Sequence, residues 1–255
     1  MSKLGWKDTR LGMLSTLYVT LLLIFFLNVV NIVLRYSKLC NNCYCVRWDC
    51  NVIYRYQLKL TISHTEGEIN MYGVEILVRE HDNILRIAEV MRMASLAVLE
   101  GREVNTEDFE DMVEFVRNYA DKHHHGKEED ILFVYMKNEL GKVGENLIQH
   151  GMLVEHDLGR LHIKQLYEAA QEYKKSQSSM AKLDIITNAV CYSDLIKRHI
   201  GKENEVVFTY GEKNLSEESR NKVDVMTKEM EENAENEGIQ KKYISLLEHL
   251  ERIYL

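Results

Sequence analysis

Two short stretches of the chain repeat the same pattern of histidine and glutamate. The first, HHGKEE, begins at His124, and the second, HIGKEN, begins at His199. A single histidine precedes each stretch at the same spacing, His81 in the first case and His156 in the second. His156 follows His81 by 75 residues, and His199 follows His124 by the same 75 residues. We refer to this relation as the internal repeat, and two residues 75 positions apart are counterparts in it. The side chains that could bind a metal are duplicated as a set.

The spacing within each stretch indicates what chemistry the set could support. A histidine and a glutamate four residues apart lie on one face of a helix and can reach the same metal ion or two adjacent ions. One histidine from each of two helices, with a His-x-x-x-Glu pair from each of two others, suits a dinuclear site in a four-helix bundle. Imidazole together with carboxylate suits iron, and also manganese or zinc. The pattern predicts a two-metal site.

Other histidines in the chain must be weighed against this set. A lone histidine on an apolar helix face is usually a hydrogen-bonded core residue, but the duplicated set would bring carboxylates into the core without partners, which is costly. The repeat selects His124 over its neighbours, because only His124 aligns with His199. His125 is one position round the helix and is a candidate additional ligand. We expect His123 to be solvated, and Lys127 and Lys202 to be exposed or paired with a carboxylate.

Helices are predicted to position these residues. The chain contains no proline, the main helix breaker, which fits an all-α protein. We expect Gly141 and Gly144 to form a loop between the second and third helices of the bundle. The expected helices run from Tyr72 to about Glu100, from Asn105 or Thr106 through His124, from between Glu145 and Gly151 to about Lys175, from about Met180 to Tyr210, from Ser216 to Gly238, and from Lys241 to Tyr254.

The N-terminal part of the chain, residues 1–70, differs from the rest. Residues 11–34 carry no charge, and about 20 apolar residues span a bilayer, so a transmembrane helix is predicted. Four of the five cysteines lie between Cys40 and Cys50, either as zinc or cluster ligands or, more simply, in an irregular linker. Alternatively, residues 1–70 are not translated. The codons of Glu66–Glu68 can form a purine run that resembles a bacterial ribosome-binding site, and Met71 would then be the start. We expect a membrane-anchored protein in the first case and a cytoplasmic protein in the second.

Charge is unevenly distributed along the chain. The net charge is −8; residues 1–70 carry eight basic and four acidic side chains, whereas the remaining residues carry 24 basic and 36 acidic ones. The larger part is acidic and has no basic stripe, which argues against nucleic acid as a partner. It also contains a single cysteine, Cys191, which excludes a disulfide framework there.

The repeated motifs resemble the hemerythrin HHE cation-binding family, over Met71 to about Tyr210. The resemblance implies an up-and-down four-helix bundle in residues 71–212, preceded by the N-terminal hydrophobic segment 1–70 and followed by an extension of two further helices in residues 213–255. It also implies two non-haem iron ions bridged by the two carboxylates, with manganese or zinc as weaker alternatives. The implied ligands are His81, His124, Glu128, His156, His199 and Glu203.

The sequence departs from the oxygen-carrying members of that family at two places. Met152 stands where those proteins have a second histidine, and Glu203 follows His199 by four residues instead of an aspartate by five. Both departures argue against reversible oxygen carriage, and the missing ligand leaves a position for water or His125. The resemblance then implies a protein that binds or senses O2, NO or iron.

An enzymatic role is the alternative. Such an enzyme would act on peroxide or nitric oxide, or would supply iron for the repair of iron–sulfur clusters. Tyr192, seven residues before His199 on the same helix face, is the one general acid or base that stands out. A structural bundle that holds zinc is the weakest of the three hypotheses, and whether the protein is an enzyme stays open.

Overall fold

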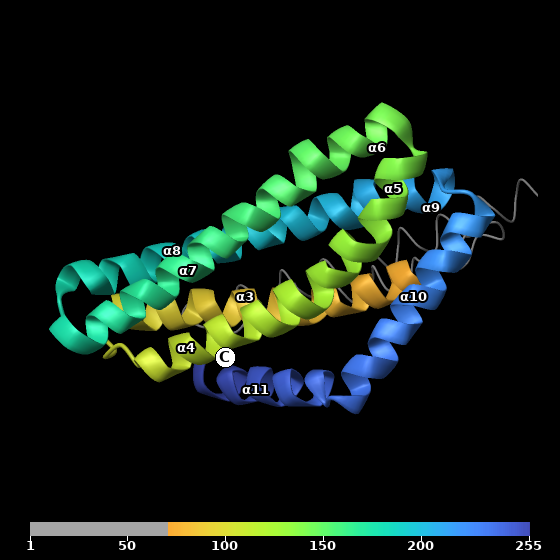
Figure 1. Cartoon of the computed structure of the whole chain (residues 1–255). Coiled ribbons are helices and arrows are strands. Elements are labelled where there is room, and N and C mark those ends of the chain that lie inside the picture. The colour runs from red at the N-terminus through yellow and green to blue at the C-terminus, as the bar shows by residue number, and fades with distance from the viewer. Residues whose placement is uncertain (1–70) are drawn as a thin grey trace, which may run out of the picture. The chain divides into compact units, whose positions relative to one another are not determined.

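The computed structural model describes residues 71–255, and all regular structure in them is helical (Figure 1). Four long helical segments are followed by two further helices. The first segment is α3 (Tyr72–Leu99). The second comprises α4 (Thr106–Phe115), η1 (Val116–His125), η2 (Glu128–Leu132) and α5 (Phe133–Glu139), and the third comprises α6 (Gly141–Leu147), η3 (Ile148–Met152) and α7 (Leu153–Ser176). The fourth comprises α8 (Ser179–Lys202), η4 (Glu203–Val207) and α9 (Phe208–Asn214), and the chain ends with α10 (Glu217–Asn236) and α11 (Ile239–Tyr254).

The helix boundaries follow local signals in the sequence. Asn105 caps α4 by accepting a hydrogen bond from the Glu107 amide, and Ser216 caps α10 in the same way. Gly101 has a φ of +104°, a conformation that glycine adopts at little cost, directly after α3 ends. Gly238 separates α10 from α11 with a φ of +71°. These expected starts and stops are confirmed.

The expected loop around Gly141 and Gly144 is reduced to a sharp break, at which Gly141 has a φ of +58°. Only Leu140 interrupts the helices there, and α6 begins at Gly141, so the third segment starts earlier than predicted. Gly144 lies inside α6, where a Cβ atom would come within 2.5 Å of the Met136 carbonyl oxygen. This glycine permits the close approach of α5 and α6, which a sequence pattern cannot distinguish from a loop signal.

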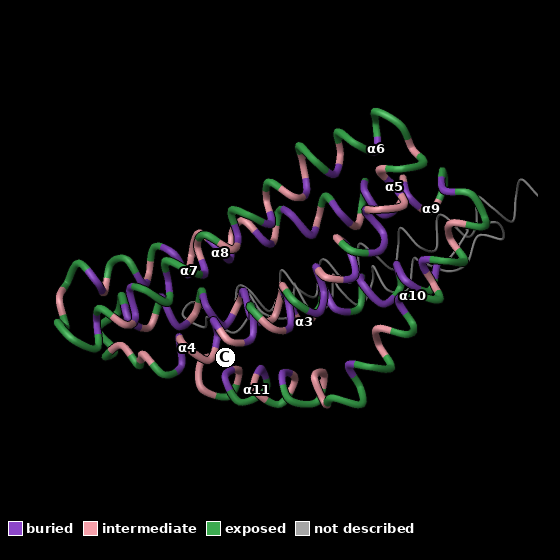
Figure 2. Tube along the Cα trace, in the orientation of Figure 1, coloured by how far each residue is buried: buried purple, intermediate pink, exposed green. Residues whose placement is uncertain are grey.

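The four long segments pack side by side around an apolar interior. Helix α8 packs along both α7 and α3, and α11 packs against α3 and α4. Buried residues of α3, α7 and α8 face the interior of this bundle (Figure 2). One apolar cluster fills the half that contains α4 and α11, and a second fills the half that contains α5 and α9. The candidate metal-binding residues lie on the turns between these two clusters.

Four segments of residues 71–255, labelled η, are π-helical, and two of them, η2 and η4, lie at matching positions. Segment η2 begins at Glu128 and η4 begins at Glu203, each is five residues long, and the two glutamates are related by the internal repeat. A π-helix is rare and occurs frequently at functional sites, because its wider turn changes the direction of the side chains that follow. At these two glutamates the sequence repeat is therefore also a repeat of backbone geometry, whereas η1 and η3 have no π-helical counterpart.

Residues 71–255 belong to one compact unit, which includes α10 and α11. The proposed division at residue 212 stays a prediction. Among residues 71–255, no helix is both long and apolar enough to cross a bilayer. The predicted transmembrane helix at 11–34, the cysteine-rich linker and the question of whether 1–70 are translated all lie outside the described residues.

Candidate metal site

Side chains from all four long segments converge in the interior of the bundle. Each of the six side chains that the repeat singles out is at most 2% exposed. They are His81 on α3, His124 on η1, Glu128 on η2, His156 on α7, His199 on α8 and Glu203 on η4. Residues far apart in the sequence thus meet at one buried place, as the spacing predicted.

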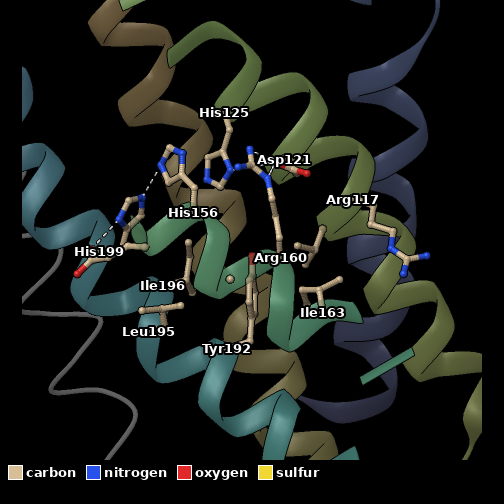
Figure 3. A pocket seen from close by; sticks show the side chains of 13 residues that line it. Arg117, Asp121, His125, His156, Arg160, Ile163, Tyr192, Leu195, Ile196 and His199 are labelled. Carbon is tan, nitrogen blue, oxygen red and sulfur yellow. Dashed lines mark hydrogen bonds and ion pairs between the residues drawn. The ribbon is translucent and has the colours of Figure 1, made fainter. Parts of the chain in front are cut away.

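The converging side chains form two groups. In the first, the ligand atoms of His81, His124, Glu128 and Glu203 all lie within 4.8 Å of one another. In the second, the same holds for His125, His156 and His199 (Figure 3). His156 and His199 bring their Nε2 atoms to 3.1 Å of each other. Two adjacent groups of this kind have the donor types and the spacing for two metal ions.

Each of the two glutamates faces both groups. Glu128 places Oε1 at 3.7 Å from Nε2 of His124 and Oε2 at 3.6 Å from Nε2 of His156. Glu203 places Oε2 at 3.3 Å from Nε2 of His81 and Oε1 at 3.1 Å from Nε2 of His199. One oxygen of each carboxylate is therefore directed to each group, so each glutamate has one donor atom for a cation at either group.

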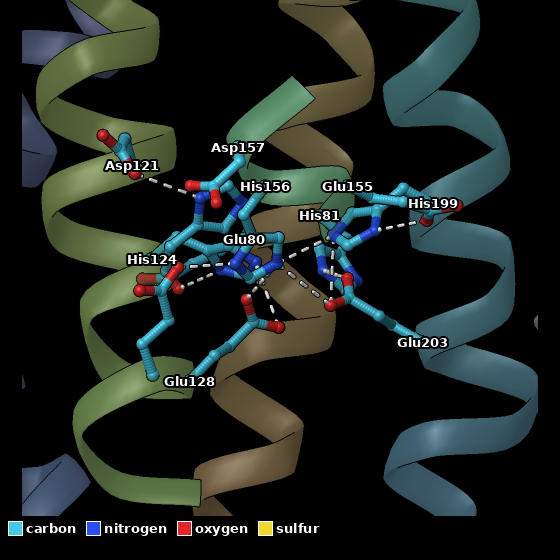
Figure 4. A network of polar contacts seen from close by, with 12 residues as sticks. Glu80, His81, Asp121, His124, Glu128, Glu155, His156, Asp157, His199 and Glu203 are labelled. Atoms are coloured by element: carbon cyan, nitrogen blue, oxygen red, sulfur yellow. Dashed lines mark hydrogen bonds and ion pairs between the residues drawn. The ribbon is translucent and has the colours of Figure 1, made fainter. Parts of the chain in front are cut away.

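The histidines of both groups are oriented by hydrogen bonds from their outer nitrogens (Figure 4). In each of the five rings, Nδ1 faces a side-chain oxygen and donates a hydrogen bond to it, so Nε2 is the nitrogen directed inward. Partners of this kind fix the tautomer and orientation of metal-binding histidines. The pairs are His81 with Asn204 at 2.9 Å, His124 with Glu80 at 2.9 Å, His125 with Asp121 at 3.2 Å, His156 with Glu129 at 2.6 Å, and His199 with Glu155 at 3.0 Å.

These outer partners obey the same internal symmetry as the histidines. Glu80, which holds His124, has Glu155 as its counterpart in the internal repeat, and Glu155 holds His199. In the same way, the partner of His81 is Asn204 and the partner of His156 is Glu129, two residues that are again related by the repeat. The spacing of the histidines does not predict these partners as a functional set, although the repeat of Glu80 and Glu155 is visible in the sequence.

His125 is where the symmetry breaks. Its counterpart is Ile200, which is buried in the core. The structure places His125 beside His156, with ring centroids 3.8 Å apart and an angle of 5° between the rings. The candidate additional ligand thus belongs to the second group geometrically. Met152, which stands in place of a second histidine, is buried among apolar side chains instead.

The buried carboxylates show whether this site fits a cation. Neither oxygen of Glu128 or of Glu203 makes a hydrogen bond, and Nε2 of His81 has no hydrogen-bond partner either. Burial and the charge of Glu203 raise the pKa of Glu128 well above its usual value. Burial favours the neutral form of Glu203 too, but the nearby His199 and His156 outweigh it and hold the pKa of Glu203 well below its usual value. A cation between these groups would give the four carboxylate oxygens a partner and would offset the cost of burying two carboxylates, so the residues fit a metal.

Comparison with protein families supports the same conclusion. The model of the hemerythrin HHE cation binding domain matches residues 72–211. The chain belongs to the hemerythrin HHE cation-binding family. The match runs from the start of α3 into α9 and includes both groups of candidate ligands. No curated protein and no solved structure matches the chain.

Membership of the hemerythrin family agrees with the all-helical structure and makes the protein a cation-binding one. Iron is the typical cation of this family. The match ends close to the end of α9, so α10 and α11 lie beyond the matched part of the chain. These two helices nevertheless contribute to the surroundings of the site.

The expectation that His123 is solvated is wrong. His123 is buried and lies 2.8 Å from Glu80, the carboxylate that holds His124. Lys127 is also buried, and its Nζ contacts Glu80, His123 and Glu231. Glu231 belongs to α10, so the C-terminal helices cover this side of the site. The sequence could not show this, because α10 has no counterpart within the repeat.

Replacing Lys127 with methionine should destabilise the protein far more than the same change at Lys202, its counterpart in the repeat. Lys127→Met leaves the buried Glu80 and the half-buried Glu231 without their cation, and breaking a buried pair such as Lys127–Glu80 costs about 3–5 kcal/mol. Lys202 pairs with Glu155, but its side chain is 48% exposed, so Lys202→Met should cost at most about 1 kcal/mol. Denaturant unfolding of the two variants measures the difference. Equal losses would show that Lys127 is not buried as described.

The two neighbouring histidines should differ in their effect on metal content. His124→Ala removes a side chain whose Nε2 is directed into the first group, so most of the bound metal should be lost. His123→Ala removes a side chain outside both groups and should leave the metal content unchanged while lowering the free energy of unfolding. Elemental analysis of both variants tests this, and equal metal loss would contradict the assignment of the helix face.

Proposed function

We propose that this hemerythrin-family protein holds two non-haem iron ions and binds or senses O2 or NO at them. One ion would be held by His81 and His124 and the other by His125, His156 and His199, with Glu128 and Glu203 shared between them. The observation that carries this proposal is the pair of fully buried carboxylates, each of which faces both histidine groups and lacks any hydrogen-bond partner.

The chain's own residues would position the ions and keep water away from them. The oxygens that face Nδ1 of each histidine prevent the rings from turning. Phe208 stacks on His81 with centroids 5.6 Å apart, and Phe133 stacks on His156 at 6.0 Å. These two phenylalanines are counterparts in the internal repeat, so each half closes its own end of the site with one aromatic ring. Ferrous iron would supply the affinity for O2 and NO that these side chains lack.

The departures from oxygen-carrying relatives favour sensing over carriage. Met152 provides no imidazole, and its place in the apolar core offers no polar atom to the site. His125 supplies a third imidazole to the second group from another helix. A diatomic ligand must then compete with or displace a donor at this position. Competition from His125 would lower the affinity for such a ligand, which argues against efficient carriage and favours a role in sensing.

An enzymatic role is supported by one further observation. A cavity opens beside the second group and contains the hydroxyl of Tyr192, a candidate proton donor. An enzyme that acts on peroxide or nitric oxide would need such a space and such a donor next to the metal. Supply of iron for cluster repair remains the other alternative, although the deep burial of the site does not favour easy release.

Metal analysis and spectroscopy of the purified full chain test the proposal. After expression with ample iron, we expect two iron ions per chain. The anaerobically reduced protein should change its absorption spectrum on exposure to O2 or NO, and faster turnover with added peroxide would favour the enzyme. One ion or none per chain would contradict the dinuclear site. Two ions with no response to O2 or NO would contradict the proposed ligands.

A further inference from the structure

A cavity of about 260 Å³ lies beside the second histidine group (Figure 3). His125, His156 and His199 line one end, and most of the remaining wall is apolar, including Ile163 and Ile196. An engineered apolar cavity of about 150 Å³ is large enough to hold benzene. The space is therefore much larger than a diatomic ligand requires.

Tyr192 places its hydroxyl into this mainly apolar space. The residue is 2% exposed, and its hydroxyl has no hydrogen-bond partner. Figure 3 shows the tyrosine ring within the cavity, with its hydroxyl directed towards Arg160 and the histidine group. Burial raises the pKa of Tyr192, so the hydroxyl stays protonated and is able to donate. Leaving such a group unpaired is unfavourable, and a molecule in the cavity with an acceptor atom would satisfy it.

Charged side chains at the cavity are already engaged. Arg160 contacts Asp121 and Glu129, the carboxylates that hold His125 and His156. Arg117 lies over the ring of Tyr167, with its guanidinium carbon 4.8 Å from the ring centroid. A charged ligand would have to break these contacts to be neutralised. The arrangement favours a neutral one.

The internal repeat explains why the cavity exists on one side of the bundle. Gly159 lines the cavity, and its counterpart in the first half is Ile84, which is fully buried. A Cβ atom at Gly159 would lie 3.6 Å from the ring of Tyr192, which is an ordinary van der Waals distance. Close helix packing therefore does not require glycine there. The missing side chain leaves open a volume that isoleucine occupies in the other half.

We propose that this cavity binds a neutral, mostly apolar organic molecule of up to about ten non-hydrogen atoms, with one oxygen that accepts a hydrogen bond from Tyr192. The inference deepens the proposed function, because it names the class of molecule that would meet the second metal position. Only the role given to the ligand depends on the proposed function. Binding to the cavity itself can be measured with and without metal.

Calorimetric titration of the full chain with benzyl alcohol tests the proposal, with toluene as the same ring without the oxygen. Benzyl alcohol should bind once per chain to both the iron-loaded and the metal-free protein, and toluene should bind about two- to tenfold more weakly. Tyr192→Phe should remove this preference. Gly159→Ile should weaken the binding of both molecules at least about tenfold, because it fills the space as Ile84 does in the other half.

Gly151→Ile is the matched control, since Gly151 lies on the same helical segment but outside this cavity. If circular dichroism shows that Gly159→Ile does not fold, Gly159→Ala replaces it, because an alanine Cβ meets only ordinary contacts. It should weaken binding to a smaller degree. No binding of benzyl alcohol to the unaltered chain, or equal binding to the Gly159 variant, would overturn the proposal.

The outcomes separate this inference from the proposed function. Two irons per chain without binding of benzyl alcohol would refute the cavity ligand and leave the dinuclear site intact. Binding of benzyl alcohol to a chain that never acquires two irons would refute the dinuclear site and leave the cavity ligand intact. Equal affinities for benzyl alcohol and toluene would show that Tyr192 plays no part in recognition and would overturn its assigned role.

Discussion

Glutamine in place of both Glu128 and Glu203 is expected to reduce the metal content of the purified chain from two ions to almost none. Each carboxylate directs one oxygen to each histidine group, so removing both charges weakens both metal positions together. An amide is a neutral and weaker ligand of almost the same size, so the bundle should still fold. Elemental analysis after expression with ample iron measures the loss.

Asp130 and Glu205 provide the matched control for this experiment. They are exposed carboxylates two residues after Glu128 and Glu203, and they are themselves related by the internal repeat. Asp130→Asn with Glu205→Gln should leave the metal content at two ions per chain. If the glutamine variant at 128 and 203 also keeps two ions, the assignment of these residues as shared ligands is wrong.

Without metal, Glu128→Gln should raise the free energy of unfolding, although the same substitution weakens metal binding. The pKa of Glu128 is raised above 4.5 in the folded state, so folding becomes less favourable as the pH rises above that value and the unfolded chain ionises. Glutamine cannot ionise and avoids this cost. The metal-free variant should therefore be more stable than the unaltered chain by about 1–3 kcal/mol at neutral pH and equally stable below about pH 4. Urea unfolding across this pH range measures it.

Isoleucine at position 125 is expected to lower the metal content from two ions to about one. His125 contributes one of the three imidazoles of the second group and takes no part in the first group. Isoleucine is the residue that the chain itself has at the equivalent position, Ile200, where it packs in the core. The substitution should thus remove a donor without disturbing the fold. The remaining ion should be the one held by His81 and His124.

His123→Ile is the control for this second experiment, because His123 is a neighbouring buried histidine outside both groups. It should keep both ions. To identify which ion is lost, His81→Ala can be combined with His125→Ile, and the combination should bind no metal. Two ions retained in His125→Ile would establish that His125 only packs against His156 and that water or another group completes the second position.

The sequence determined the helical class and the core of the candidate site. A spacing of four residues places His124 and Glu128 on one helix face whatever surrounds them, because helix geometry is local. The internal repeat adds a second copy, and two copies related by symmetry must direct equivalent side chains to a common axis. For that reason all six residues that the repeat singles out are found together.

Tertiary structure decided the burial and the partners of residues that are equivalent in the internal repeat. Lys127 and Lys202 occupy the same place in their motifs, yet α10 covers Lys127 and leaves Lys202 half exposed. The glycines beside them differ in the same way. A Cβ atom at Gly126 would lie 3.2 Å from Met230 of α10, whereas a Cβ atom at Gly201 would meet no other atom within 4 Å. His125 likewise acquires its place only because α7 brings His156 alongside it. The burial and the partners of a residue depend on which distant helix covers it, and the local spacing of residues cannot predict that helix.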